Sequence, residues 1–244
     1  IYTLSLHDAL PILVIPYFYR NKIEFSFSET RWLTPEEIAS KETIDSRNGL
    51  GFHIAGAWDK VLDIHKCHLQ QDPSNAIRNT LKAYALSQGY TFYNPRTHTG
   101  WLRTIMIRIT SLGELMVVIQ FLEEQQHERE QLLDYLLAQF PQITSLQYII
   151  NNKPNDTIYD QEVICYHGRD FIYEQMEGLR FKINAKSFFQ TNSTQAYELY
   201  KVTRDFAALT GEELVYDLYT GTGTIAQFVA QKDRKSTRLN SSHW

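Results

Sequence analysis

Cysteine is scarce in this sequence, and the two cysteines lie far apart. Cys67 and Cys165 are the only ones among 244 residues. A disulfide-bonded scaffold is therefore excluded, because such frameworks need several cysteines at short spacings. Unpaired cysteines favour a reducing compartment, so we expect the protein to be cytoplasmic.

Long apolar runs and an excess of positive charge are also missing. No stretch reaches the roughly 18 consecutive apolar residues of a membrane-spanning helix, so no membrane contact is expected. Lysine and arginine number 24 against 28 aspartates and glutamates, which gives a net charge of −4. That balance does not indicate a polyanionic partner, so any nucleic acid must be bound by local positive charge. The 43% of hydrophobic residues is typical of a globular protein with a substantial core.

Both ends of the chain differ in character from the middle. Residues 1–12 lack the basic opening and apolar centre of a signal peptide, and residues 233–244 continue no helical or strand periodicity. Both stretches resemble translated sequencing adapters, and we expect them to be artefactual and unstructured. Frayed natural termini are the alternative.

The pattern over residues 13–181 predicts a central α+β domain. Apolar and polar residues alternate, or β-branched residues cluster, in short segments that we expect to be strands. Helical spacing or a capping signal marks three other segments. The expected strands are 23–27, 61–64, 102–109, 115–121, 146–150, 162–166, 170–175 and 179–183, and the expected helices are 32–38, 72–85 and 128–140.

The last fifty residues change character. A helix is expected over 191–209, a strand over 213–219, then a glycine-containing loop and a second helix that ends near residue 231. This order is one β-loop-α unit, and a parallel sheet needs several such units. We therefore expect residues 182–232 to be the truncated start of an α/β, Rossmann-like domain.

The loop of this unit reads DLYTGTG and has three interpretations. Glycines at a strand-to-helix turn let backbone N–H groups approach a ligand. Gly221, Gly223 and Ala226 fit a dinucleotide fingerprint, although the acidic residue expected about 20 positions later would fall in the C-terminal tail or beyond. Asp217, inside the expected strand and four residues before Gly221, instead favours an adenosylmethionine site. An ordinary tight turn is the third possibility.

The segment before this loop, KSFFQTN at residues 186–192, decides between these interpretations. Together with DLYTGTG it resembles the bacterial RNA (uracil-5-)-methyltransferases, most nearly the 23S ribosomal RNA enzymes. Shorter pieces at 19–25 and 63–67 agree, and the resemblance covers roughly residues 17–231. It implies that the α/β part belongs to a class I methyltransferase domain that binds S-adenosyl-L-methionine.

In that family a cysteine adds to C6 of uracil, the methyl group passes to C5, and a glutamate removes the C5 proton. By resemblance, Gln190, Tyr219 and Thr224 contact the cofactor, and Asp217, Gly221 and Gly223 belong to the same site. The family often has asparagine at the place of Thr224. Gln190 could instead cap the following helix, and Tyr219 could simply pack in the core. We expect Gln190, Tyr219, Thr224 and the two glycines to line one concave surface.

The resemblance also identifies what the chain lacks. The catalytic cysteine and glutamate match positions beyond residue 231, so the fragment is expected to be inactive. Cys67 matches the fourth ligand of an iron–sulfur cluster whose other three cysteines would precede residue 13, so a cluster is expected in the full-length protein only. Zinc bound by Cys67 with His65 and His68 is a weaker alternative. We expect Cys67 near the surface without a cysteine partner, and Cys165 to be buried in a strand.

The expected substrate is ribosomal RNA, with transfer RNA second, and the expected state is a monomer. The central domain would contact the RNA and lie near the cluster. Aromatic and basic residues interleave over 17–22 and 93–103, which suits stacking on unpaired bases, although either set could be a surface beside a packed strand. Two other functions stay open, a nucleotide-linked oxidoreductase built on the GxGxxA loop and a non-catalytic RNA-binding module.

Overall fold

The computed structural model describes residues 16–40, 43–44, 46–210, 212–213, 215–218 and 220–230. The two ends that we expected to be artefactual, 1–12 and 233–244, lie outside the described residues, as does Tyr219.

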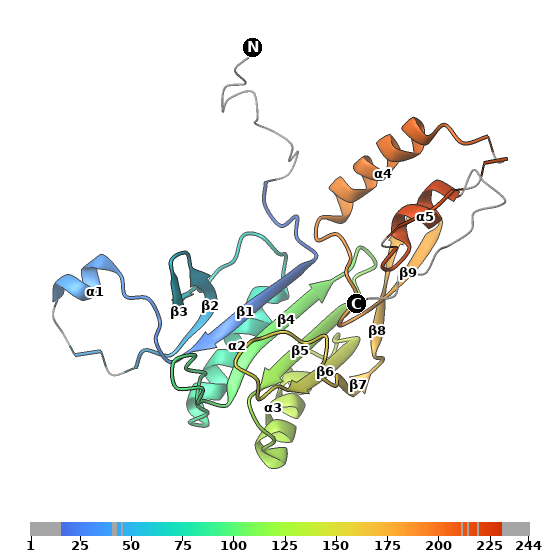
Figure 1. Cartoon of the computed structure of the whole chain (residues 1–244). Coiled ribbons are helices and arrows are strands. Elements are labelled where there is room, and N and C mark those ends of the chain that lie inside the picture. Colours follow the sequence, from blue (N-terminus) through green and yellow to red (C-terminus); the bar gives the residue numbers. More distant parts are fainter. Residues whose placement is uncertain are drawn as a thin grey trace, which may run out of the picture.

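A seven-stranded mixed sheet forms the centre of the molecule (Figure 1). Its strand order is β3-β2-β1-β4-β5-β6-β7. Neighbouring strands are antiparallel except β5 and β6, which run parallel and are joined through α3 (Gln126–Gln139). The strands are β1 (Lys22–Ser28), β2 (Gly49–Ile54), β3 (Ala57–Asp63), β4 (Leu102–Ile109), β5 (Leu115–Phe121), β6 (Ser145–Ile150) and β7 (Ile164–Gly168).

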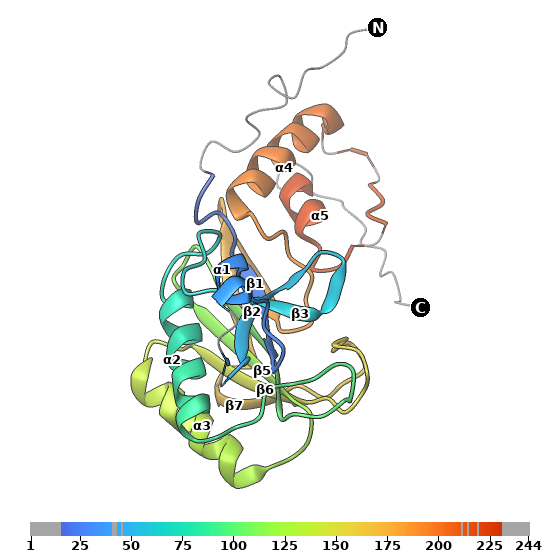
Figure 2. The ribbon, with the colours of Figure 1, turned by 90° about the vertical axis from the view of Figure 1, so that its left-hand side faces the viewer.

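Two helices cover one face of this sheet. In Figure 2, α2 (Ser74–Ser87) and α3 lie side by side against the strands. Alternate side chains of each strand point to this face because the side-chain period of a strand is two residues. The main core therefore combines Ile105 and Ile107 of β4 with Leu81 of α2 and Leu133 of α3.

A second core lies on the opposite face of the sheet. Met106, Met116 and Val118 point to this side and join a cluster with Phe181 and Phe228. The cluster is completed by a two-stranded ribbon and by two helices near the top of Figure 1. These elements are β8 (Phe171–Met176), β9 (Leu179–Asn184), α4 (Ser193–Ala207) and α5 (Thr224–Val229).

The domain boundary expected between residues 181 and 182 falls inside β9, and the division into domains stays a prediction. The short helix α1 (Pro35–Ser40) begins as its TPEE sequence indicates. The Thr34 backbone N–H donates to the Glu37 carboxylate at 2.9 Å, and the Glu37 N–H donates to Thr34 Oγ1 at 3.3 Å. This reciprocal pair is a capping box.

Most elements expected from the sequence are present in the expected order, including the β4–β5 hairpin and helices α2, α3 and α4. The sequence patterns did not predict the strand β2. The strand expected over 213–219 is wrong for the described part, because residues 213 and 215–218 form no strand. A strand needs a neighbour for its backbone N–H and C=O groups, and the described strands all pair elsewhere. The Rossmann-like unit that this strand would open stays a prediction.

Among the described residues, no helix has both the length and the apolar character needed to cross a membrane.

Candidate functional site

The glycine loop after residue 219 is a tight turn that requires both of its glycines. Gly221 has φ 53° and Gly223 has φ 72°, in the left-handed region where other residues are strained. The Gly223 N–H donates to the Thr220 carbonyl at 2.7 Å, and the Gly223 carbonyl accepts from Gln227 N at 3.0 Å. The turn therefore leads directly into α5, with Gly223 as its N-cap residue.

Hydroxyl groups line this turn. Thr222 Oγ1 and Thr224 Oγ1 lie 2.7 Å apart in a hydrogen bond. Thr220 Oγ1 donates to the Asp217 carbonyl at 2.8 Å, which places Asp217 at the start of the turn. The sequence predicted that Asp217 lies in a strand. This prediction is wrong, because its segment has no strand partner in the described part of the chain.

One hydrogen bond connects the loop to the KSFFQTN segment. Thr222 Oγ1 donates to the Phe188 carbonyl over 3.4 Å, although the two residues are 34 positions apart. Gln190 follows Phe188 by two residues. The two stretches that carry the family resemblance therefore lie side by side.

The backbone of Gln190 is held by Asn21, the residue that precedes β1. Asn21 Nδ2 donates to the Gln190 carbonyl at 2.8 Å, and the Asn21 N–H donates to the Thr191 carbonyl at 2.7 Å. The helix cap is provided by Asn192, whose Oδ1 accepts from Gln195 N at 3.0 Å, so the alternative role of Gln190 as a cap is wrong. The Gln190 amide has no hydrogen-bond partner within the part of the chain that the structure describes. It is free to contact a ligand.

Glu174 fixes the start of α4, a role that the sequence did not reveal. This carboxylate is 1% exposed. Its Oε2 accepts from Ser193 Oγ at 2.9 Å, while its Oε1 accepts from Ser111 N at 3.0 Å and from Ser111 Oγ. These contacts join α4, β8 and the β4–β5 turn, and they hold the first residue of α4 three positions after Gln190.

Comparison with known proteins assigns the family. No family model matches the chain. Proteins named uncharacterized RNA methyltransferases are 57% identical over 221 residues in Bacteroides thetaiotaomicron and 57% over 218 residues in Porphyromonas gingivalis. These alignments cover 89% and 87% of this chain, and 49% and 47% of the relatives. A relative of the same name in Chlorobaculum tepidum is 36% identical, with 92% of this chain and 47% of the relative covered.

The chain belongs to this RNA methyltransferase family. The resemblance found in the sequence is thereby confirmed as to family. The chain spans about half the length of the curated relatives that it matches.

A solved structure agrees in fold with this member of the family. The Pyrococcus abyssi tRNA (uracil-54, C5)-methyltransferase, in complex with S-adenosyl-L-homocysteine, superposes with a TM-score of 0.69 at 24% identity. The match covers 93% of this chain and 50% of that one. At this identity the likeness concerns the fold alone.

The cysteines of this family member do not lie where we expected them. Cys67 is only 4% exposed, because it packs in the main core. Asn75 of α2 binds both its backbone groups, accepting from Cys67 N at 2.6 Å and donating to the Cys67 carbonyl at 3.1 Å. Cys165 is exposed, because it lies in the edge strand β7. The expected surface position of Cys67 and burial of Cys165 are both wrong.

Cys67 is a free cysteine in the described part of the chain. Its loop lies beside the chain that enters β1, since Phe18 N donates to the His68 carbonyl at 2.8 Å. The described residues contain no group of three or more His, Cys, Asp or Glu that could hold a metal ion. The role of Cys67 as a cluster ligand in a longer protein stays a prediction.

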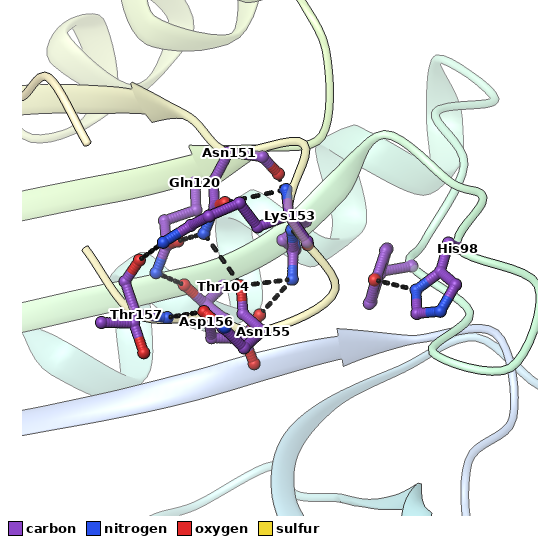
Figure 3. Close-up of polar contacts among 10 residues, drawn as sticks. His98, Thr104, Gln120, Asn151, Lys153, Asn155, Asp156 and Thr157 are labelled. Atoms are coloured by element: carbon purple, nitrogen blue, oxygen red, sulfur yellow. Dashed lines mark hydrogen bonds and ion pairs between the residues drawn. The ribbon is translucent and has the colours of Figure 1, made fainter. Parts of the chain in front are cut away.

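The interleaved stretch 93–103 is buried at its two ends and exposed between them, where Arg96 and His98 lie. Tyr93, Trp101 and Arg103 are at most 6% exposed, so the alternative of a packed strand applies to these three residues. Figure 3 shows polar contacts of Asn151, Lys153, Asn155 and Asp156, the four residues whose oxygens bind the Arg103 guanidinium. This guanidinium donates to the carbonyls of Asn151 and Lys153 at 2.5 and 2.6 Å and pairs with Asp156 at 2.6 Å.

The other interleaved stretch, 17–22, is open to solvent at its first two residues and half-buried in the rest. Tyr17 and Phe18 are 59% and 46% exposed, and the His68 ring lies within 6.2 Å of both aromatic rings. Exposed aromatic faces next to a basic residue such as Arg20 can stack on unpaired bases. This stretch therefore remains a candidate for RNA contact.

Proposed function

We propose that this chain is part of an S-adenosyl-L-methionine-dependent RNA methyltransferase that methylates C5 of uridine, with ribosomal RNA as substrate and transfer RNA as the second choice. The observation that carries the proposal is the Thr222–Phe188 hydrogen bond, which brings the glycine loop beside the segment that contains Gln190. Family membership supports RNA methylation, and it favours the adenosylmethionine interpretation of the loop over the dinucleotide one. The fold of the tRNA methyltransferase supports a related architecture.

The residues present suit the polar ends of S-adenosyl-L-methionine. The free Gln190 amide offers both a donor and an acceptor, which matches the ammonium and carboxylate of the amino-acid end. Positive φ at Gly221 and Gly223 lets the backbone of the loop approach a ligand without a Cβ in between. Thr222 and Thr224 add hydroxyls, and their mutual hydrogen bond leaves acceptor capacity on both oxygens. When bound, the cofactor supplies an electrophilic methyl group.

The chemistry at the base requires a nucleophile. C5 of uracil is a poor nucleophile until a thiolate adds to C6 and pushes the C5=C6 electron pair toward C5 and O4. After methylation a base must remove the C5 proton, so that the thiolate can leave and the double bond can re-form. The family resemblance assigns these roles to a cysteine and a glutamate beyond residue 231. The buried Cys67 and the exposed Cys165 match neither position.

The test is methyl transfer by the full-length protein that contains this chain. Tritiated S-adenosyl-L-methionine is supplied with unmodified ribosomal RNA or transfer RNA, and the labelled nucleoside is identified after digestion. We expect 5-methyluridine in ribosomal RNA. Gln190→Ala should raise the KM for the cofactor, whereas Gln88→Ala, in an exposed turn after α2, should not. Label in another nucleoside would overturn the uracil assignment, and label in transfer RNA alone would overturn the ribosomal one.

A further inference from the structure

A cavity of about 430 Å³ lies between the sheet and the 185–191 segment. Lys22 of β1 and Arg108 of β4 line it from the sheet, and Lys186 lines it from the segment. Arg108 follows Met106 by two residues in β4, so both side chains point to the face covered by β8, β9 and α4. The cavity therefore adjoins the segment that touches the glycine loop.

Arg108 is a buried cation with unused donors. It is 2% exposed, and its Nη2 donates to the Ser187 carbonyl at 3.2 Å. Its Nε and Nη1 are buried and have no hydrogen-bond partner among the described residues. Burial lowers the pKa of Arg108 to about 10, so the side chain stays charged at neutral pH. Buried donors without acceptors are rare in native proteins and often indicate an ion or ligand.

A second cation lies directly across from Arg108. The β1–β4 register places Lys22 opposite Arg108, with both side chains on the same face of the sheet. Like charges at directly opposed positions destabilise a strand pair. Burial, and then the charge of Arg108, lower the pKa of Lys22, which reflects this conflict. An anion between the two side chains would remove the repulsion between Lys22 and Arg108.

The neighbouring carboxylates offset this charge only in part. Of the two that line the cavity, Asp156 is already paired with Arg103 at 2.6 Å, which leaves Glu24. Glu174 favours the charged form of Arg108 electrostatically, but its oxygens are already used by Ser111 and Ser193. Lys186 adds a further positive charge at the rim, where its Nζ donates to the Tyr159 carbonyl at 3.1 Å. Positive charge therefore prevails in the cavity of a chain that is acidic overall.

We propose that this cavity binds a phosphodiester group of the RNA substrate, held by Arg108 and Lys22. This inference rests on the proposed function, because it takes RNA as the ligand. A planar guanidinium with free donors suits phosphate oxygens, and a lysine adds a point charge. Contacts to phosphate fix the register of a nucleic acid without reading its sequence. A phosphate bound beside the 185–191 segment would therefore hold the RNA strand next to the methyl-transfer site.

The first test is the salt dependence of RNA binding by the full-length protein. Each phosphate contact with a single strand contributes about 0.7 to the slope of log K against log salt concentration. Because both side chains hold the same phosphate, we expect Arg108→Met and Lys22→Gln each to reduce the magnitude of this slope by up to about 0.7, and the double variant to reduce it by no more than about 0.7. Lys82→Gln is the matched control, because Lys82 belongs to α2 on the other face of the sheet and should leave the slope unchanged.

The second test measures melting temperature with inorganic phosphate at constant ionic strength. Phosphate should raise the melting temperature of the wild type but not that of Arg108→Met. Without phosphate, Arg108→Met should be at least as stable as the wild type, because an apolar side chain replaces a buried charge. This result would also establish that the variant is folded.

The outcomes separate this inference from the proposed function. RNA binding with unchanged slopes in both variants would overturn the phosphodiester site and leave the methyltransferase proposal standing. Stabilisation by phosphate with unchanged RNA slopes would assign the cavity to a small phosphorylated ligand and would likewise overturn the inference. A wild-type protein that binds no RNA would overturn the proposed function itself, and the inference with it.

Discussion

Replacement of Glu174 by glutamine tests whether a buried carboxylate positions the cofactor side of the molecule. Four donors converge on this side chain: Ser111 N, Ser111 Oγ, Gln175 N and Ser193 Oγ. In the Glu174→Gln variant the amide oxygen can keep the three donors that face Oε1. The NH₂ group then meets Ser193 Oγ, which already accepts from Asn21 Nδ2 at 2.8 Å.

The expected loss of stability follows from the charge of these hydrogen bonds. A hydrogen bond to a charged group contributes about 1.5–3 kcal/mol, against about 0.5–1.5 kcal/mol for a neutral one. Removal of the buried charge also removes part of its desolvation cost, which offsets some of the loss. We therefore expect Glu174→Gln to lower the free energy of unfolding by about 1–3 kcal/mol.

The assay combines melting temperature with cofactor affinity in the full-length protein. Each kcal/mol corresponds to about 2–4 °C for a domain of roughly 150–250 residues, and to less for the longer full-length protein. The affinity for S-adenosyl-L-methionine, measured by calorimetry, should fall as well, because Ser193 begins the helix that follows Gln190. Glu198→Gln, on the exposed side of α4, is the control and should change neither quantity noticeably. A Glu174→Gln protein with wild-type melting temperature would refute the reasoning.

Four other changes test separate parts of the structure. Gly223→Ala should weaken cofactor binding in calorimetry and cost about 1–2 kcal/mol, because φ at this position is 72°. Phe188→Ala should leave the melting temperature nearly unchanged but reduce methyl transfer, since the ring is 69% exposed beside the glycine loop. The Arg31 and Thr34 hydrogen bonds lower the pKa of Glu37 to about 2 from 4.5, so the stability that it provides is present above pH 4.5 and is lost as the pH falls toward 2. In the Glu37→Gln variant, amide exchange of helix α1 should not show this pH dependence. Residues 13–232 alone should transfer no methyl group to ribosomal RNA, and turnover would mean that the nucleophile is not the cysteine that we expect downstream.

Local sequence signals predicted most of the regular structure but failed where tertiary contact decides. The β4–β5 hairpin and α2 follow from periodicity within one segment. Strand β2 was missed because its glycines interrupt that pattern. Gly51 is needed because a Cβ there would come within 1.9 Å of the Leu62 carbonyl in β3. That close approach concerns a different strand and leaves no mark in the local pattern.

The candidate site, too, could be predicted from the sequence only where its motifs are local. The glycine loop and the neighbouring Gln190 segment could be identified because their motifs are continuous in the sequence. The role of Glu174 could not, since its partner Ser111 lies 63 residues away. The backbone of Cys67 is held by Asn75 of α2. The Arg103 guanidinium is used by carbonyls 48 and 50 residues further on and is not available to RNA. Such contacts arise only once the sheet has assembled.

The 185–191 segment is held by the buried side chains of Ala185 and Phe189 and by several backbone carbonyls. The structural role of these groups can be separated from the chemical role of the other side chains. The Ser187 carbonyl accepts from Arg108, the Phe188 carbonyl from Thr222, and the Gln190 carbonyl from Asn21. None of these contacts depends on which side chain the segment presents at that position. The exposed Phe188 ring and the unpartnered Gln190 amide are therefore not needed to hold the segment in place, and binding of cofactor or RNA gives a physical reason for their presence. One segment thus links the sheet that carries the proposed phosphate cavity to the loop that carries the proposed cofactor site.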